Sequence, residues 1–299
     1  MTTFAQLGLA PEILRALVAK GYENPTPIQA QAIPAAMQGR DILGAAQTGT
    51  GKTAGFALPL LHRLVTSKAQ LVRQRAPRAL VLTPTRELAA QVEESFRTYG
   101  AYTGLSSTVI FGGVGMGNQI TALRQGVDIV IATPGRLLDH MQQRTVDLSK
   151  IDTLILDEAD RMFDLGFIAD VRYVMRRLPD RGERLTMMFS ATLSLRVLEL
   201  AYEHMHNPKK LAADAGTKTA ARVTQSVYFP AGEEKMPLLL GILATFKPTR
   251  AIVFVNTKHV AEKIQRTLER NQQLAGVLSG DVPQRKRMTL LERFKKGEI

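Results

Sequence analysis

The 299-residue sequence contains no cysteine. Disulfide bonds, thiolate zinc sites and cysteine nucleophiles are therefore excluded, a composition typical of proteins in the reducing cytoplasm. No stretch approaches the ~18 uncharged apolar residues of a membrane-spanning helix, and the N-terminus lacks the basic and apolar segments of a secretion signal. We therefore expect a cytoplasmic protein with no membrane partner.

Acidic residues are in the minority, with 27 Asp and Glu against 39 Lys and Arg and a formal net charge of +12. This excess of positive charge favours a polyanionic partner, and nucleic acid fits better than a membrane surface. The five histidines show no spacing typical of metal ligands, so a histidine metal site is not expected. The length predicts roughly two domains, each able to bury its own core.

A glycine-rich segment lies between an apolar run and a helical pattern, and reads Ala46-Gln47-Thr48-Gly49-Thr50-Gly51-Lys52-Thr53. Strand, glycine-rich turn and helix are the context that a phosphate-binding loop (P-loop) requires. Gly49 and Gly51 let successive backbone N–H groups face one anion, and the helix N-terminus adds its positive dipole end. Lys52 can then reach the β- and γ-phosphates of a nucleotide, and Thr53 can offer its hydroxyl to Mg²⁺. The strict motif begins with glycine, whereas this sequence has Ala46.

A second motif follows the apolar run 154–156, and reads Asp157-Glu158-Ala159-Asp160. In P-loop nucleotidases the first such carboxylate holds Mg²⁺ and the second orients the attacking water. Taken alone, the segment is an acidic turn. Its position after an apolar strand and downstream of a P-loop favours nucleotide hydrolysis.

Strand and helix patterns alternate along the chain, which predicts an α/β fold with mainly parallel sheets covered by helices. In the first half we expect strands at 79–83, 108–111, 128–132, 153–156 and 186–189, and helices at 10–20, 52–67, 86–99, 116–125, 134–143 and 166–178. In the second half we expect strands at 223–229, 251–255 and 274–278, and helices at 233–246, 258–270 and 283–296. Periodicity is lost between the halves, which predicts domains at 1–212 and 223–299 with a linker at 213–222.

The ends of other predicted strands carry turns with hydroxyls, bare backbone or arginine: Pro84, Thr85 and Arg86; Gly112 and Gly113; Thr133, Pro134, Gly135 and Arg136. These groups can contact a sugar-phosphate backbone without reading bases. Each segment can equally be a helix cap, because Thr and Pro are common at helix starts. After the last strand of this half, Ser190 and Thr192 could bond Asp160 and couple the acidic motif to the neighbouring site.

Taken together, these motifs resemble those of the DEAD-box RNA helicases of superfamily 2, and the resemblance covers the whole chain. Residues 21–29 resemble the adenine-recognising Q motif, in which Gln29 would read the adenine edge, Tyr22 would stack on the ring and Phe4 would buttress it. Residues from the second half resemble further RNA-contacting motifs: Asn256, Thr257, Gly280, Asp281, Gln284 and Arg287. The family usually has histidine where this sequence has Ser279, so that position is not assigned. Phe4 lies almost at the start, as in bacterial-type members.

The resemblance implies two RecA-like domains and an ATP-dependent RNA helicase with little sequence preference. Lys52, Asp157 and Glu158 would be catalytic, Thr53 and Asp157 would hold Mg²⁺, and residues 48–53 would bind ATP. Ribonucleoprotein or RNA-decay assemblies are candidate partners. Two alternatives stay open, a small-molecule P-loop kinase and an ATP- and RNA-binding clamp without efficient turnover.

The family's motifs V and VI are not found before residue 299. We therefore expect an incomplete second domain, slow hydrolysis by this chain, and higher protease sensitivity in residues 222–299 than in residues 1–212.

Overall fold

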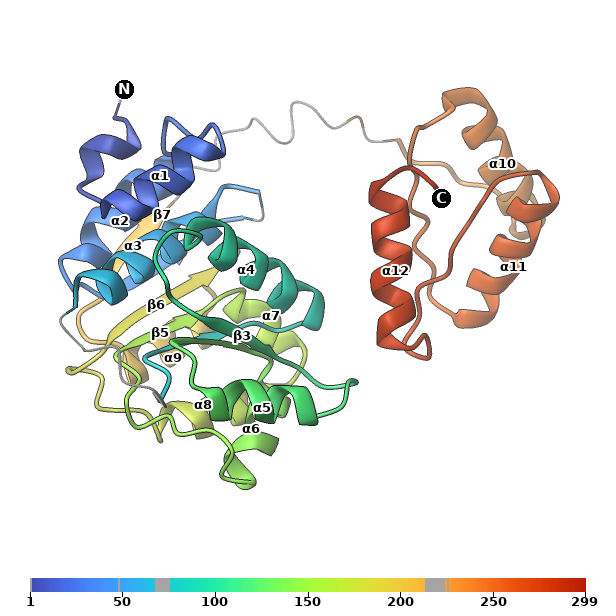
Figure 1. The fold of residues 1–299 in the computed structure, drawn as a ribbon. Coiled ribbons are helices and arrows are strands. Elements are labelled where there is room, and N and C mark those ends of the chain that lie inside the picture. The colour runs from blue at the N-terminus through green and yellow to red at the C-terminus, as the bar shows by residue number, and fades with distance from the viewer. Residues whose placement is uncertain (1, 48, 68–75, 213–223, 225) are drawn as a thin grey trace. The chain divides into compact units, whose positions relative to one another are not determined.

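The computed structural model describes residues 2–47, 49–67, 76–212, 224 and 226–299 (Figure 1). The chain divides into two compact units, Met1–Gly216 and Thr217–Ile299, and each is described by itself. The predicted linker at 213–222 lies outside the described residues. In the part of the chain that is described, no helix is long and apolar enough to cross a lipid bilayer.

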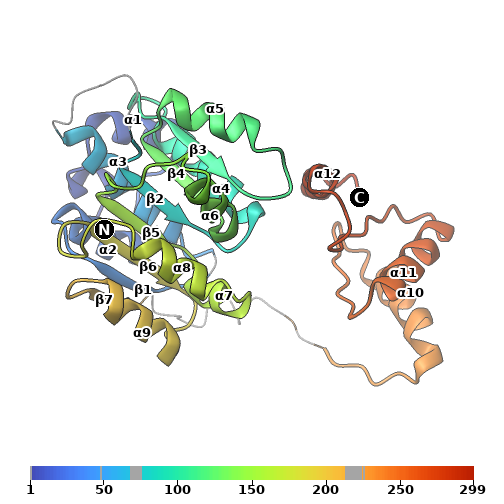
Figure 2. The same ribbon diagram turned by 90° about the horizontal axis from the view of Figure 1, so that it is seen from below.

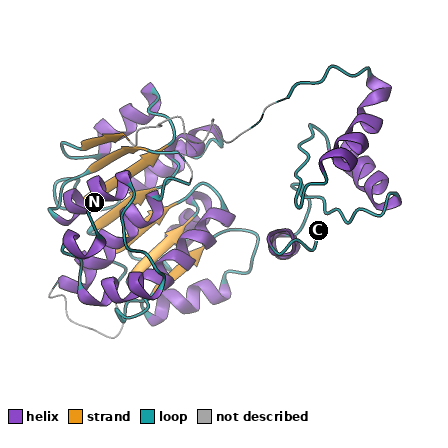
Figure 3. Ribbon diagram, turned by 90° about the horizontal axis from the view of Figure 1, so that it is seen from above, coloured by secondary structure: helices purple, strands orange, loops and turns teal. Residues whose placement is uncertain are grey.

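The first unit is built on a seven-stranded sheet in which every pair of neighbours is parallel, so the predicted α/β architecture is confirmed (Figure 3). The strands are β1 (Ile42–Ala45), β2 (Ala79–Leu82), β3 (Ser107–Ile110), β4 (Ile129–Ala132), β5 (Thr153–Leu156), β6 (Leu185–Ser190) and β7 (Lys209–Ala212). Their order across the sheet is β3-β4-β2-β5-β6-β1-β7. This order places the carboxyl ends of β5, β6 and β1 side by side, and those of β3, β4 and β2 in a second group.

Helices cover both faces of the sheet because the inner strands β2, β4, β5 and β6 are buried on both sides. They are α1 (Pro11–Ala19), α2 (Pro27–Met37), α3 (Lys52–Thr66), α4 (Arg86–Tyr99), α5 (Gly117–Gln125), α6 (Pro134–Gln142), α7 (Ala159–Asp164), α8 (Ile168–Met175) and α9 (Leu195–His204), with a short 3₁₀ helix at Phe4–Leu7. In β2, Ala79 and Val81 face a core shared with α1 to α4, whereas Leu80 and Leu82 face a core shared with α6 to α9. Figure 2 shows the two helical layers on either side of the strands.

Local signals set most helix starts. Proline occupies the first position of α1, α2 and α6, where its missing N–H costs no hydrogen bond. The hydroxyl of Thr85 accepts the Leu88 N–H at 3.3 Å and caps α4, and Ser194 caps α9 in the same way. These elements lie within one or two residues of the predicted bounds, with one exception. The helix predicted at 166–178 is found as α8, but it is shorter and ends at Met175. The short helix α7 lies before the predicted range, and Gly166, at a φ of 79°, lies between the two helices. No prediction was made for β7, for α7 or for the bounds of α9.

The second unit contains α10 (Lys235–Phe246), α11 (Lys258–Arg270) and α12 (Gln284–Lys295), preceded by a 3₁₀ turn at Gly232–Glu234. Its helices agree with the predicted ranges. The predicted strands at 251–255 and 274–278 are wrong, and the described residues of 223–229 also form no strand. These segments have no backbone pairing with a neighbour among the described residues, and a parallel strand exists only through such pairing.

Candidate nucleotide and RNA site

The P-loop follows β1 and leads into α3, as the sequence predicts. Gly49 and Gly51 have φ angles of 86° and 85°, the left-handed region that favours glycine. Thr50 donates its hydroxyl hydrogen to the Gln47 carbonyl at 2.8 Å and so closes the turn. Thr48 lies outside the described residues. The turn leaves Lys52 and Thr53 as the first two residues of α3, at the positive end of the helix.

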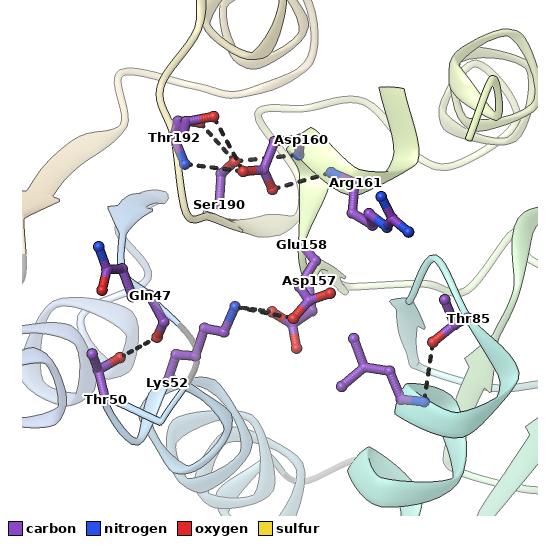
Figure 4. A network of polar contacts seen from close by, with 11 residues as sticks. Gln47, Thr50, Lys52, Thr85, Asp157, Glu158, Asp160, Arg161, Ser190 and Thr192 are labelled. Atoms are coloured by element: carbon purple, nitrogen blue, oxygen red, sulfur yellow. Dashed lines mark hydrogen bonds and ion pairs between the residues drawn. The ribbon is translucent and has the colours of Figure 1, made fainter. Parts of the chain in front are cut away.

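Lys52 joins the P-loop to the acidic motif across two strand ends (Figure 4). Its side chain is buried, and its Nζ lies 3.4 Å from Oδ1 of Asp157 and 3.7 Å from Oε1 of Glu158. Glu158 has a φ of 55°, which is uncommon for a residue with a Cβ and is tolerated where the surroundings hold it. The cation and both carboxylates therefore share one small space.

Asp157 has the properties of a ligand for a divalent cation. It is fully buried, and neither carboxylate oxygen makes a hydrogen bond among the described residues. Burial raises the pKa of Asp157 to about 6, and the nearby charge of Lys52 opposes this only in part. Within the described residues there is no group of three or more His, Cys, Asp or Glu that could hold a metal by themselves. Mg²⁺ binds one or two carboxylates together with substrate phosphates and water, and Asp157 is one such buried carboxylate.

Asp160 is tied to the end of β6. Its backbone N–H donates to the Ser190 hydroxyl at 3.2 Å, and its carboxylate accepts the N–H and the hydroxyl of Thr192 at 3.0 and 3.1 Å. Ser190 in turn donates its hydroxyl hydrogen to the Thr192 carbonyl at 2.7 Å. Burial raises the pKa of Asp160, but these hydrogen bonds outweigh it and hold the pKa below its usual value. The structure thus brings together the three residues predicted to couple the two motifs.

The three residues predicted to recognise adenine differ in burial and in the contacts that they already make within the protein. The Gln29 amide accepts the Thr26 N–H at 2.9 Å and donates to the Gly51 carbonyl at 2.9 Å, so it already links α2 to the P-loop. Phe4 is buried. Tyr22 is half exposed, and its ring centroid lies 6.5 Å from that of Tyr99.

Two arginines, Arg86 and Arg136, contact the loop that follows β3 from the loops that follow β2 and β4. Gly113 has a φ of 80°, and a Cβ there would lie 2.1 Å from Nη1 of Arg86, so a larger residue would be strained and would displace the Arg86 guanidinium. Arg136 donates to the Val114 carbonyl at 3.1 Å and lies near Gly112. The sequence-predicted residues after β2, β3 and β4 therefore meet in one place: Pro84, Thr85, Arg86, Gly112, Gly113, Thr133, Pro134, Gly135 and Arg136.

Comparison with known proteins decides the family. The model of the DEAD/DEAH box helicase family matches residues 26–201, and that of the helicase conserved C-terminal domain matches residues 234–299. The chain belongs to the DEAD/DEAH box helicase family.

Among curated relatives of this helicase-family chain, an ATP-dependent RNA helicase RhlB of Xanthomonas campestris is 52% identical over 99% of the chain. An ATP-dependent RNA helicase RhlB of Aeromonas hydrophila is 48% identical, and the match covers 69% of that relative. The chain spans 52% of the length of the Xanthomonas relative. A crystal structure of a DEAD box protein from Methanococcus jannaschii superposes with a TM-score of 0.65 at 33% identity, covering 100% of this chain and 78% of that one.

Sequence reasoning missed Gln119 and His140, which support the loop at Gly112 and Gly113 after β3 in this helicase-family site. The His140 ring is fully buried and lies 3.1 Å from the Gln119 side chain, which donates to the Phe111 carbonyl at 3.0 Å. Burial lowers the pKa of His140, which keeps the ring neutral. Histidines were considered only as metal ligands, and the link from α6 to α5 has no local sequence signal.

The RNA-contacting residues predicted in the second half all lie at the starts of helices or just before them. The Thr257 hydroxyl accepts the Val260 N–H and caps α11, directly after Asn256. Asp281, next to Gly280, pairs with Lys258. Gln284 is the buried first residue of α12, and Arg287 lies one turn further along.

Proposed function

We propose that the protein is an ATP-dependent RNA helicase that remodels RNA in the cytoplasm through contacts to the sugar-phosphate backbone. The observation that carries this is the convergence of Lys52, Asp157 and Glu158 at the ends of β1 and β5, beside the arginine-held loops after β2, β3 and β4. The relatives named above are ATP-dependent RNA helicases. Ribonucleoprotein or RNA-decay assemblies are the proposed partners.

In this proposal residues 1–212 form the ATP-binding domain and residues 223–299 form part of the second helicase domain. The Lys52 ammonium neutralises the β- and γ-phosphates, and the N–H groups of the P-loop hold them in place. Thr53 and Asp157 would hold Mg²⁺, which adds positive charge at the phosphates when bound. Glu158 accepts a proton from the attacking water and aligns it.

RNA would lie across the backbone groups at the ends of β2, β3 and β4. Hydroxyls, glycine N–H groups and arginines position phosphates but carry little sequence information. Asp160, Ser190 and Thr192 connect this group to the nucleotide, because the Asp160 motif follows β5, which is the neighbour of β2. In this proposal the second unit has RNA contacts of its own, including Asn256 and Arg287.

The experiment is RNA-stimulated ATP hydrolysis together with strand separation of a short RNA duplex, measured on this chain and on a longer chain that carries motifs V and VI, in which the variants are compared. Glu158→Gln should lower turnover by ~10²–10⁴-fold while ATP still binds, because the carboxylate that accepts the proton is lost. Lys52→Ala should weaken ATP binding itself. The matched control is Asp164→Asn, an exposed acid on the same helix. Parent-level turnover by Glu158→Gln would overturn the catalytic assignment.

A clamp without turnover is the second candidate, and the same assay separates it. It would bind ATP and RNA together but show no stimulated hydrolysis even in the longer chain that carries motifs V and VI. Adenine preference over guanine is tested by titrating ATP and GTP. Equal affinities would remove the assignment of Gln29 to adenine. The Gln29 amide would then serve only to link Thr26 to the Gly51 carbonyl, through the two hydrogen bonds that it already makes.

A further inference from the structure

A group of exposed aromatic and basic side chains lies at the carboxyl ends of α8 and α9, in the turn after α8 and at the start of β7, away from the site described above. We call it the α8–α9 surface, and define it by Tyr173, Arg176, Arg177, Arg181, Tyr202 and Lys210. Val171 and Val174 of α8 share one buried core with Val197 and Leu200 of α9, so both helices lie on the same face of the sheet (Figure 2).

Both tyrosines of this surface are open to solvent and each has a cation beside its ring. Tyr173 is 40% exposed, and the Arg177 guanidinium carbon lies 3.3 Å from its ring centroid. Tyr202 is 60% exposed, and Nζ of Lys210 lies 5.6 Å from its ring centroid and 3.2 Å from its hydroxyl. The Arg177 guanidinium lies over one face of the Tyr173 ring, so a base there can stack on the stacked pair, and both cations offer a charge for the phosphate.

The two tyrosines are held in a fixed arrangement. Arg181 donates from Nη1 to the carbonyls of Tyr202 and Glu203 at 3.0 and 3.3 Å, at the last turn of α9. Arg172 of α8 bonds both carboxylate oxygens of Glu203 at 3.0 Å. Such preorganisation reduces the ordering cost of binding.

The charge of this region suits a polyanion. Residues 172–184 and 195–212 contain eight Arg and Lys against four Asp and Glu. Two of the four acids, Glu199 and Glu203, lie within 3.8 and 3.0 Å of the Arg172 guanidinium, which offsets their charge. Asp180 and Glu183 are the other two and lie exposed in the turn after α8.

The surface is separate from the proposed helicase site. Tyr173 and Tyr202 lie near the carboxyl ends of α8 and α9, and Lys210 lies near the start of β7. In a parallel sheet, helices return the chain to the edge where strands begin, whereas the P-loop and the arginine-held loops follow strand ends. One RNA cannot contact both groups without passing around the unit.

From these observations we infer that the α8–α9 surface is a second binding surface for single-stranded RNA. Tyr173 and Tyr202 stack on unpaired bases, and Arg176, Arg177, Arg181 and Lys210 neutralise the adjoining phosphates. An acidic protein segment would use the cations but would have no use for the two exposed rings, so RNA is the better fit. The inference goes beyond the proposed function and does not require ATP hydrolysis.

The test measures binding of a fluorescently labelled oligouridylate to the full chain without nucleotide, at low salt. The background is Arg86→Gln with Arg136→Gln, which weakens the proposed helicase contacts. On it, Tyr173→Ala with Tyr202→Ala should weaken the remaining binding by ~10-fold or more, since each stacked base contributes substantially. Arg177→Gln with Lys210→Gln should reduce the salt dependence of binding.

The matched control is Tyr102→Ala, because Tyr102 is 41% exposed with Arg15 4.1 Å from its ring centroid but lies outside the surface. It should leave binding unchanged. Ultraviolet crosslinking of the parent chain to the same RNA should label peptides containing Tyr173 or Tyr202. Binding unchanged by the tyrosine variants, crosslinks absent from these peptides, or polyglutamate binding with equal affinity at this surface would overturn the inference.

Discussion

The two units contain equally apolar segments that reach different structures. In the first unit all four side chains of β2, residues 79–82, are fully buried. In the second unit the segment 251–255 reads Ala-Ile-Val-Phe-Val, yet Ile252 is 65% and Phe254 is 91% exposed. The difference is backbone pairing, because β2 has a parallel neighbour on each side and 251–255 has none among the described residues. A β-rich apolar run becomes a buried strand only where neighbours complete its hydrogen bonds.

The largest test of this comparison removes a phenylalanine from each unit. Phe189 packs 5.5 Å from Phe56, and a Cβ on Gly44 would lie 2.6 Å from its ring, so it fills its space completely. Phe189→Ala should lower the free energy of unfolding by ~3–5 kcal/mol, whereas Phe254→Ala should change it by less than ~0.5 kcal/mol. Urea unfolding followed by circular dichroism measures both. Similar losses in the two variants would show that the second segment is buried after all.

The next test uses the buried carboxylate of Asp157, for which the second unit has no counterpart among its described residues. Its pKa is raised from 3.8 to about 6, so the folded state gains stability by protonation, and this gain is lost as the pH rises through about 6. In EDTA, the stability of Asp157→Asn relative to the parent should therefore increase by ~2 kcal/mol between pH 4 and pH 7. Thermal unfolding across this pH range measures it. A constant difference would mean that Asp157 titrates normally.

Two glycines, one from each unit, are expected to differ in how they tolerate substitution by alanine. Gly51 has a φ of 85°, and a Cβ there would lie 2.4 Å from Nε2 of Gln29, so Gly51→Ala should cost ~1–3 kcal/mol and weaken ATP binding. Gly241, inside α10, has open space around it. Gly241→Ala should instead stabilise the second unit by ~0.5–1 kcal/mol. Melting temperatures and ATP titration give both signs, and a stabilising Gly51→Ala would contradict the strain at the P-loop.

The smallest expected difference in stability is between the variants of two aspartates, one from each unit. Asp160 accepts hydrogen bonds from Thr192, and Asp160→Asn should cost ~1 kcal/mol at neutral pH. Because the pKa of Asp160 is lowered, this contribution is present above its usual pKa and is lost as the pH falls below it. Asp281 pairs with Lys258 on an exposed surface, so Asp281→Asn should cost less than ~0.5 kcal/mol. Chemical unfolding at pH 7 and pH 3 tests this, and an equal cost for both at pH 7 would contradict it.

Local sequence determined much of this protein. The P-loop could be predicted because Gly49, Gly51 and Lys52 act within one turn, and helix starts could be predicted because proline and threonine caps act on adjacent residues. The acidic motif was visible for the same reason, since Asp157 follows directly on an apolar strand. These features depend on contacts between residues that are neighbours in the chain.

Tertiary structure decided the rest. Only the strand order β5-β6-β1 brings Asp157 within 3.4 Å of Lys52, and no local pattern specifies which strands become neighbours. The bonds of the Gln29 amide to Thr26 and Gly51, and the passage of Arg86 past Gly113, likewise depend on how elements pack. At residues 251–255 the local sequence predicts an element that the structure does not contain. Its apolar side chains predict a strand, but strand formation requires hydrogen bonds to another segment, which a local pattern cannot supply.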